Sequence, residues 1–167
     1  NTFVPLVDLG FCTDGDFVLN DPTRKLVWLP QGADERIVGK GTRREGVVAK
    51  PILFTGIVRN AGEERGRWFR GLQERYAGQI THYTNGMYRE ELRDCIASHM
   101  IVVAPDSPVT SWYWSNRVWN ALGFGAFLLH PWSRGLAQFY PSELRQIVYY
   151  ENHGHLYELI DKYLPRV

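Results

Sequence analysis

The segment SNRVWNALGFGAFLLHP, residues 115–131, contains the transition that decides the fold. It predicts a helix over about 116–122, a stop at GFG (123–125), and a strand AFLLH over 126–130. A helix that ends and leads into a buried strand needs glycine at that point, so we interpret the glycines as structural. Arg117 lies near the expected amino end of the helix, where free backbone N–H groups and the helix dipole favour an anion. The segment is therefore compatible with packing alone and with an anion site.

The same alternation of short apolar runs and helical patterns continues from Pro51 to the end of the chain. Further strands are predicted at ILFTGIV (52–58), QITHY (79–83), IVVAP (101–105) and QIVYY (146–150). Between and after them, apolar residues recur at helical spacing: Trp68, Phe69, Leu72 and Tyr76; Tyr88, Leu92, Ile96 and Met100; a short helix around 136–140; and Leu156, Leu159, Ile160 and Tyr163. The pattern predicts an α/β fold, a Rossmann-like doubly wound parallel sheet of about five strands with helices on both faces.

The helix after the first of these strands has recognisable ends. Asn60 with Glu63 three residues later resembles a capping box, and Gly78 marks the stop.

Residues 1–50 lack this rhythm. Asp, Gly, Asn and Pro are scattered through 8–22, KLVWLP (25–30) could form one strand, and GKGTRREG (39–46) is typical of an exposed basic loop. We interpret residues 1–50 as a linker segment that leads into a single domain over 51–167.

Composition limits the class of protein. The chain has 167 residues, 44% hydrophobic and 22% charged, with a net charge of +1, which argues against disorder and against a basic surface for nucleic acid. Any anion site must therefore be local. Two cysteines without a CxxC pair fit a reducing compartment, and no segment predicts a membrane span or a signal peptide, so we expect a cytoplasmic protein. A start at Asn1 also fits a piece of a longer protein.

The ligand crevice of an open α/β sheet lies beyond the carboxyl ends of its strands. Arg59 and Arg117 follow predicted strands, and the guanidinium fork suits phosphate, so the two could form a cradle for a diphosphate. Alternatively, each arginine is solvated or paired with a carboxylate. In SWYWSNR (111–117), Trp112 and Trp114 could stack on a base or a sugar, or they could close the core or contact another domain.

Several site types find no support in the sequence. There is no GK[ST] phosphate loop and no G-x-G-x-x-G after the first strand, which argues against an NTPase or a nicotinamide enzyme. His153 and His155 do not form a metal set, and no serine or cysteine has the setting of a nucleophile. We expect neither a metal nor a cofactor.

Taken in order, FTGIVR, the aromatic loop, SNRVWNALGFGAFLLHP, GLAQFYP and HLYELIDKYL resemble the carboxyl-terminal domain of GT-B glycosyltransferases, in particular the CgeB-like branch of the group 1 family. The resemblance covers about residues 51–164, and WLPQGAD (28–34) resembles the segment that enters this domain from the first half. It implies one half of a two-domain architecture, which holds a nucleotide-sugar donor in a cleft facing an amino-terminal acceptor domain.

The resemblance also implies residue roles. Gly56 and Arg59 would belong to the loop beneath the diphosphate, and Arg117 to the helix that meets the donor. Asn120 falls where relatives usually carry a glutamate that accepts hydrogen bonds from donor hydroxyls, and asparagine keeps an acceptor but loses the charge.

The resemblance implies metal-independent sugar transfer from an NDP-sugar, with UDP as the first candidate nucleotide, to an unidentified acceptor. The general base would come from the acceptor domain or a partner chain, so we expect the isolated chain to be inactive and to self-associate. Two alternatives stay open: a non-catalytic module that binds a nucleotide or nucleotide sugar, and a purely structural α/β interaction domain.

Overall fold

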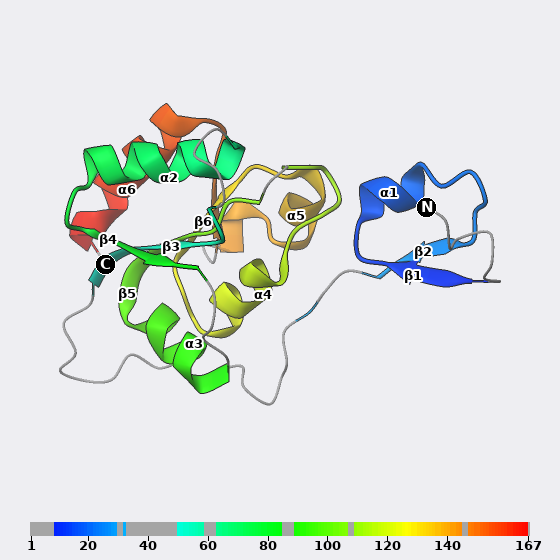
Figure 1. The fold of residues 1–167 in the computed structure, drawn as a ribbon, viewed down its shortest axis with the longest axis horizontal. Helices are drawn as coiled ribbons and strands as arrows, with labels where there is room; N and C mark the ends of the chain where they lie inside the picture. Colours follow the sequence, from blue (N-terminus) through cyan, green and yellow to red (C-terminus); the bar gives the residue numbers. More distant parts are fainter. Residues whose placement is uncertain are drawn as a thin grey trace.

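The computed structural model describes residues 9–29, 32, 50–58, 63–84, 89–106, 109–144 and 147–166. Within these residues, the main element is a five-stranded parallel sheet in the order β4-β3-β5-β6-β7 (Figure 1). Its strands are β3 (Lys50–Thr55), β4 (Ile80–Tyr83), β5 (His99–Val103), β6 (Leu128–Pro131) and β7 (Ile147–Tyr150). The predicted Rossmann-like parallel sheet is confirmed.

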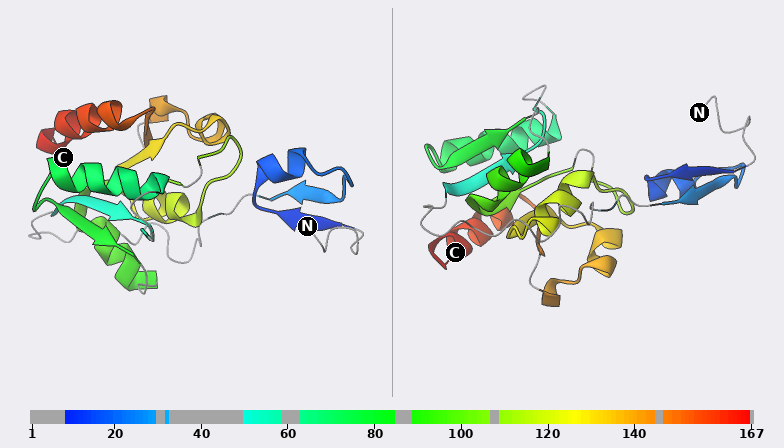
Figure 2. Two further views of the ribbon diagram at one scale, coloured as in Figure 1. Left: turned by 45° about the horizontal axis from the view of Figure 1, so that its top comes forward. Right: turned by 90° about the horizontal axis from the view of Figure 1, so that it is seen from below.

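Helices cover both faces of this sheet. They are α2 (Glu64–Arg75), α3 (Arg89–Ala97), α4 (Asn116–Gly123), α5 (Arg134–Phe139) and α6 (His153–Tyr163), with short 3-10 turns η2 (Ser142–Leu144) and η3 (Leu164–Arg166). Helices α2 and α6 pack on one face, and α3, α4 and α5 on the other (Figures 1 and 2).

The central strand β3 shows why the apolar runs are continuous. Ile52 and Phe54 belong to the core under α2 and α6, whereas Leu53 belongs to the core under α3 and α4. All three side chains are fully buried. A parallel strand covered on both faces has no polar side, so it lacks the polar–apolar alternation of a half-exposed strand.

The strand order fixes where a ligand crevice can form. From β3 the chain passes to the outer strand β4, and then crosses back to β5 on the other side of β3. The direction of winding therefore reverses between β3 and β5. In open α/β sheets, ligands bind at the carboxyl ends of the strands near such a reversal.

A small second sheet precedes the main domain. Strand β1 (Gly10–Cys12) pairs in parallel with β2 (Leu26–Trp28), and helix α1 (Gly15–Leu19) connects them. The strand predicted at residues 25–30 is present as β2. Strand β1 and helix α1 were not predicted, because they are too short to produce a readable periodicity. The unit contacts the aromatic loop of the main domain, since the Gly15 N–H donates to the Trp112 carbonyl (3.0 Å).

Some predicted element ends are also wrong. The residue that precedes α2 is Glu63, so Asn60 is not its cap, and Asn60 itself lies outside the described residues. Helix α3 ends at Ala97, which leaves Met100 in strand β5. Strand β3 stops at Thr55 because the next residue, Gly56, has φ +131°, a conformation that only glycine adopts without strain.

Candidate functional site

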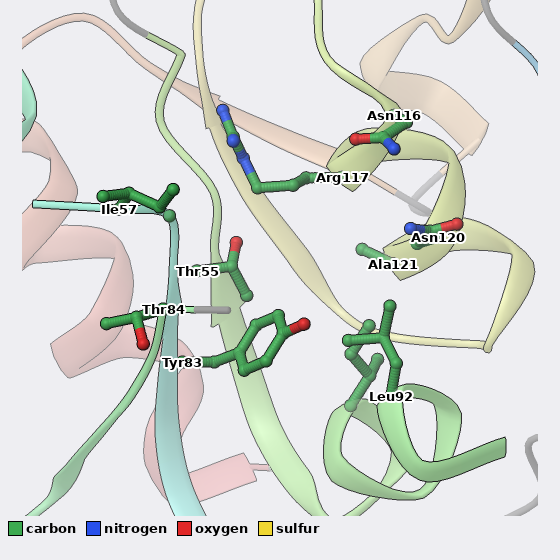
Figure 3. A pocket seen from close by; sticks show the side chains of 11 residues that line it. Thr55, Ile57, Tyr83, Thr84, Leu92, Asn116, Arg117, Asn120 and Ala121 are labelled. Carbon is green, nitrogen blue, oxygen red and sulfur yellow. The ribbon is translucent and has the colours of Figure 1, made fainter. Parts of the chain in front are cut away.

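A pocket of about 240 Å³ opens at the carboxyl ends of β3 and β4 (Figure 3). Residues 55–57 form its wall at the end of β3, and Tyr83 and Thr84 form the wall at the end of β4. Leu92 and Ile96 of α3 close its apolar side. The pocket therefore lies beside the point at which the winding of the sheet reverses, where a ligand is expected.

Helix α4 provides the polar wall of the pocket. It buries Val118 and Ala121 against the sheet, at 0% and 1% exposure. The adjoining face of the helix turns Asn116, Arg117 and Asn120 toward the pocket (Figure 3). The helical period of 3.6 residues brings the positions i, i+1 and i+4 to one side, so the same sequence supplies a core stripe and a polar site.

A buried carboxylate lies behind this wall. Asp106 follows β5 and is 1% exposed. It accepts a hydrogen bond from Nη2 of Arg117 (3.0 Å) and one from the backbone N–H of Ser115 (3.3 Å), and Nε2 of His130 lies 3.1 Å from it. Burial tends to raise the pKa of Asp106, but the hydrogen bonds and charges of His130 and Arg117 outweigh it and hold the pKa below its ordinary value.

Arg117 therefore contacts both the buried Asp106 and the pocket. One guanidinium nitrogen is paired with Asp106, as the alternative interpretation of the sequence allowed. The side chain also lines the pocket, and its aliphatic part extends from α4 toward the ends of the strands (Figure 3). Its Nε is buried and has no hydrogen-bond partner among the described residues.

A second arginine, Arg65, approaches the same strand ends from the first turn of α2. Its Nε donates to the carbonyl of Pro105 (3.1 Å) and its Nη1 to the carbonyl of Ile57 (3.3 Å). Burial, followed by the positive charge of Arg117, lowers the pKa of Arg65. The positive charge of Arg117 thus acts on Arg65 at these strand ends, and an anion nearby would offset both charges; Arg65 itself is not among the residues that line the pocket.

Gly56 allows this approach. A Cβ atom at position 56 would lie 2.9 Å from Cδ of Arg65, and the positive φ of the residue disfavours any side chain. The glycine thus keeps the Arg65 side chain against the loop that follows β3.

The comparison with known families bears on this arrangement. A family model described as glycosyl transferase-like matches residues 36–166, most of the chain. The chain belongs to the glycosyl transferase-like family. The match includes the pocket and both arginines described above. No curated protein matches the sequence.

Of the site residues predicted from the sequence of this glycosyltransferase-like domain, Gly56, Arg117 and Asn120 lie together at the pocket. Arg59 lies outside the described residues, so its part in a cradle with Arg117 stays a prediction. Arg65 was not predicted from the sequence, for two reasons. Arg65 lies ten residues after the end of β3, and the predicted start of the helix at Asn60 placed Arg65 beyond the first turn, whereas α2 begins at Glu64.

The two tryptophans do not line this pocket. Trp114 is 3% exposed, and its ring lies against Trp28 and Phe139, with centroids 5.7 and 5.9 Å away. It closes the core, and its faces are not open to a base or sugar. Trp112 is partly buried and meets Trp28 edge to face at 5.4 Å.

Among the described residues, no group of three or more His, Cys, Asp or Glu side chains is arranged to hold a metal ion. None of the helices in these ranges combines the length and apolar character needed to cross a membrane.

Proposed function

We propose that this chain is the donor-binding domain of a glycosyltransferase, and that the pocket beside α4 holds the diphosphate of a nucleotide sugar. UDP is the first candidate nucleotide. The observation that supports this most strongly is the convergence of Arg65, Arg117 and the amino end of α4 on the strand ends where the winding reverses. Family membership makes glycosyl transfer the reaction to which such a site contributes.

Unmet hydrogen-bonding capacity supports an anionic ligand here. Nε of Arg117, a residue that lines the pocket, is buried without a partner among the described residues. A buried polar group without a partner costs about 1–3 kcal/mol, and a phosphate oxygen would satisfy the arginine donor.

The size of the pocket indicates which part of the donor it would hold. A cavity of about 240 Å³ is smaller than the roughly 300–1,000 Å³ of a complete small-molecule site. The diphosphate would fill it, and the nucleoside and sugar would extend toward a second wall. We assign that wall to the acceptor-binding domain or to a partner chain.

The small sheet offers a surface for such a contact. Phe11 and Val27 are register partners on one face of β1 and β2, and they are 66% and 42% exposed. Parallel sheets are normally covered on both faces, so an uncovered apolar face favours a further protein layer. The same face would drive self-association of the isolated chain.

The chemistry that this site would contribute is electrostatic. The guanidinium groups of Arg65 and Arg117 and the first amides of α4 would stabilise the charge that develops on the leaving diphosphate, without a metal ion. The acceptor hydroxyl must be activated by a base, which we assign to the acceptor domain.

A non-catalytic nucleotide-binding module is the second candidate. It is favoured by Asn120, which carries no charge at the position where the resemblance implies a glutamate, and by the pairing of Arg117 with Asp106. Both candidates bind the nucleotide-sugar donor, but only the glycosyltransferase domain would take part in sugar transfer.

Calorimetric titration tests donor binding. The ligands are UDP-glucose, UDP-galactose, UDP-N-acetylglucosamine, GDP-mannose, UDP and uridine. We expect UDP and at least one sugar nucleotide to bind much more tightly than uridine. The Arg65→Gln variant should lose about tenfold in UDP affinity, because it removes one charge-assisted contact.

Arg75→Gln is the matched control, because Arg75 is an exposed arginine of the same helix that pairs with Asp161 on the surface. It should bind UDP as the unmodified chain does. Failure of every nucleotide to bind would refute both candidates and leave the structural interaction domain. Sugar transfer on addition of an acceptor domain would separate the first candidate from the second.

A further inference from the structure

His130 lies beneath the pocket without lining it. It is the third residue of β6 and is completely buried. Its Nε2 lies 3.1 Å from Oδ2 of Asp106, and its Nδ1 lies 2.7 Å from the carbonyl oxygen of Pro131. Asp106 connects His130 to the pocket, because its other oxygen accepts a hydrogen bond from Arg117, which lines the pocket.

These contacts determine where the protons of the ring belong. An ionised carboxylate and a backbone carbonyl only accept hydrogen bonds. Both ring nitrogens must therefore carry hydrogen if both contacts are hydrogen bonds, and the ring is then an imidazolium. The carboxylate of Asp106 is then shared between two cations, His130 and Arg117.

The charge presented to the pocket depends on this sharing. With His130 protonated, the group of Asp106, His130 and Arg117 has a net positive charge, and Arg65 adds a second. With His130 neutral, Arg117 alone balances Asp106, and the net positive charge falls by one.

Other ionisable groups surround the cluster. Glu63 and Tyr113 act electrostatically on Arg65, and Asp106 and Glu64 act on the buried Tyr150 of β7.

We propose that His130 is a positioning residue that sets the anion affinity of the pocket: when protonated it neutralises Asp106 and leaves the charge of Arg117 available to a bound diphosphate. The identity of that anion rests on the proposed function, whereas the charge sharing does not.

The first experiment needs no ligand. Long-range ¹H–¹⁵N correlation spectra of the imidazole rings, assigned through the backbone, report the protonation of each ring nitrogen. Under the conditions of the binding experiment, His130 should show hydrogen on both nitrogens. A neutral ring with a single protonated nitrogen would overturn the proposal. This measurement uses the unmodified chain and does not depend on whether a variant folds.

The second experiment measures the anion affinity of the unmodified chain and of two variants under the same conditions. Sulfate is one probe. UDP-glucose is the other, because its diphosphate has no free terminal phosphate, so its charge is fixed near neutral pH. Binding is followed through the side-chain amide signals of Asn116 and Asn120, which line the pocket.

His130→Asn, which keeps a hydrogen-bond donor but cannot be charged, should bind both probes on the order of tenfold more weakly than the unmodified chain, since one unit charge near the ligand is lost. His155→Asn is the matched control on α6, on the opposite face of the sheet, and should bind both probes as the unmodified chain does.

The two proposals fail in different ways. Sulfate binding that weakens in His130→Asn, combined with no binding of UDP-glucose, would refute the nucleotide-sugar assignment and leave the role of His130 intact. Equal sulfate affinity of His130→Asn and the unmodified chain, or no sulfate binding by either, would overturn the role of His130.

Discussion

Replacement of Asp106 by asparagine tests the buried charge cluster on which the site is built. The asparagine has the same shape, and its oxygen can still accept hydrogen bonds. Its NH₂ group, however, would face one of the donors that surround Asp106, from Ser115, Arg117 or His130. Removal of one partner from a buried ion pair costs about 3–5 kcal/mol. We expect the lower end, about 3 kcal/mol, because the Arg117 side chain is 25% exposed.

For a chain of 167 residues, a loss of this size corresponds to a decrease in Tm of roughly 6–12 °C. Thermal melts and urea unfolding at neutral pH measure it. Asp161→Asn is the matched control: Asp161 also pairs with an arginine, at 2.6 Å, but both side chains are about half exposed, so its Tm should change much less. Similar melting of the two variants would refute the claim that Asp106 is a structural charge.

The pH dependence of the same comparison has a definite sign. The pKa of Asp106 is lower in the folded state than its ordinary value of 3.8. Its contribution to stability is therefore fully present above that ordinary value and is lost as the pH falls through the folded-state pKa. The difference in unfolding free energy between the unmodified chain and Asp106→Asn should narrow in strong acid.

Three further predictions concern the pocket and its missing wall. Gly56→Ala should lower the free energy of unfolding by about 1–3 kcal/mol and weaken UDP binding, because the new methyl group displaces Arg65. Gly78→Ala is the control: it also has a positive φ, but no atom lies near the added methyl group, so it should lower Tm and leave UDP affinity unchanged. Asn120→Glu should bind UDP several-fold more tightly, because the carboxylate accepts hydrogen bonds from nucleotide hydroxyls, and should bind sulfate more weakly, because it adds a negative charge. Titrations of the variant with both ligands measure this, and an equal change for UDP and sulfate would contradict a nucleotide hydroxyl at position 120. The 167-residue chain alone should not transfer radiolabelled sugar from UDP-glucose to a broad acceptor pool, because the acceptor must be held about 3–3.5 Å from the reacting carbon; product formed by monomeric chain would show that the active site is complete within it.

The sheet could be predicted from the sequence because its strands are buried on both faces. Such strands produce continuous apolar runs, and the helices between them show a clear stripe, as in α4, where Val118 and Ala121 face the core. The small sheet of β1 and β2 could not be predicted, since three-residue strands are too short to show a period.

The site was only partly predictable. Arg117 and Asn120 follow from the helix that contains them and from the family resemblance. To predict Arg65 as a site residue, one must know where α2 begins, and the apparent helix cap at Asn60 indicated the wrong position. The cluster of Asp106 and His130 depends on strand order, since β5 and β6 are neighbours only in the folded sheet.

Chemical-shift mapping shows where a nucleotide binds this chain. The isotope-labelled chain is titrated with UDP-glucose, UDP and uridine, and the backbone and side-chain amide signals are followed. We expect UDP to shift the signals of Gly56, Thr84, Asn116 and Asn120, around the pocket at the carboxyl ends of β3 and β4, and uridine to shift them far less. Shifts confined to the opposite edge of the sheet, where the strands begin, would contradict this expectation.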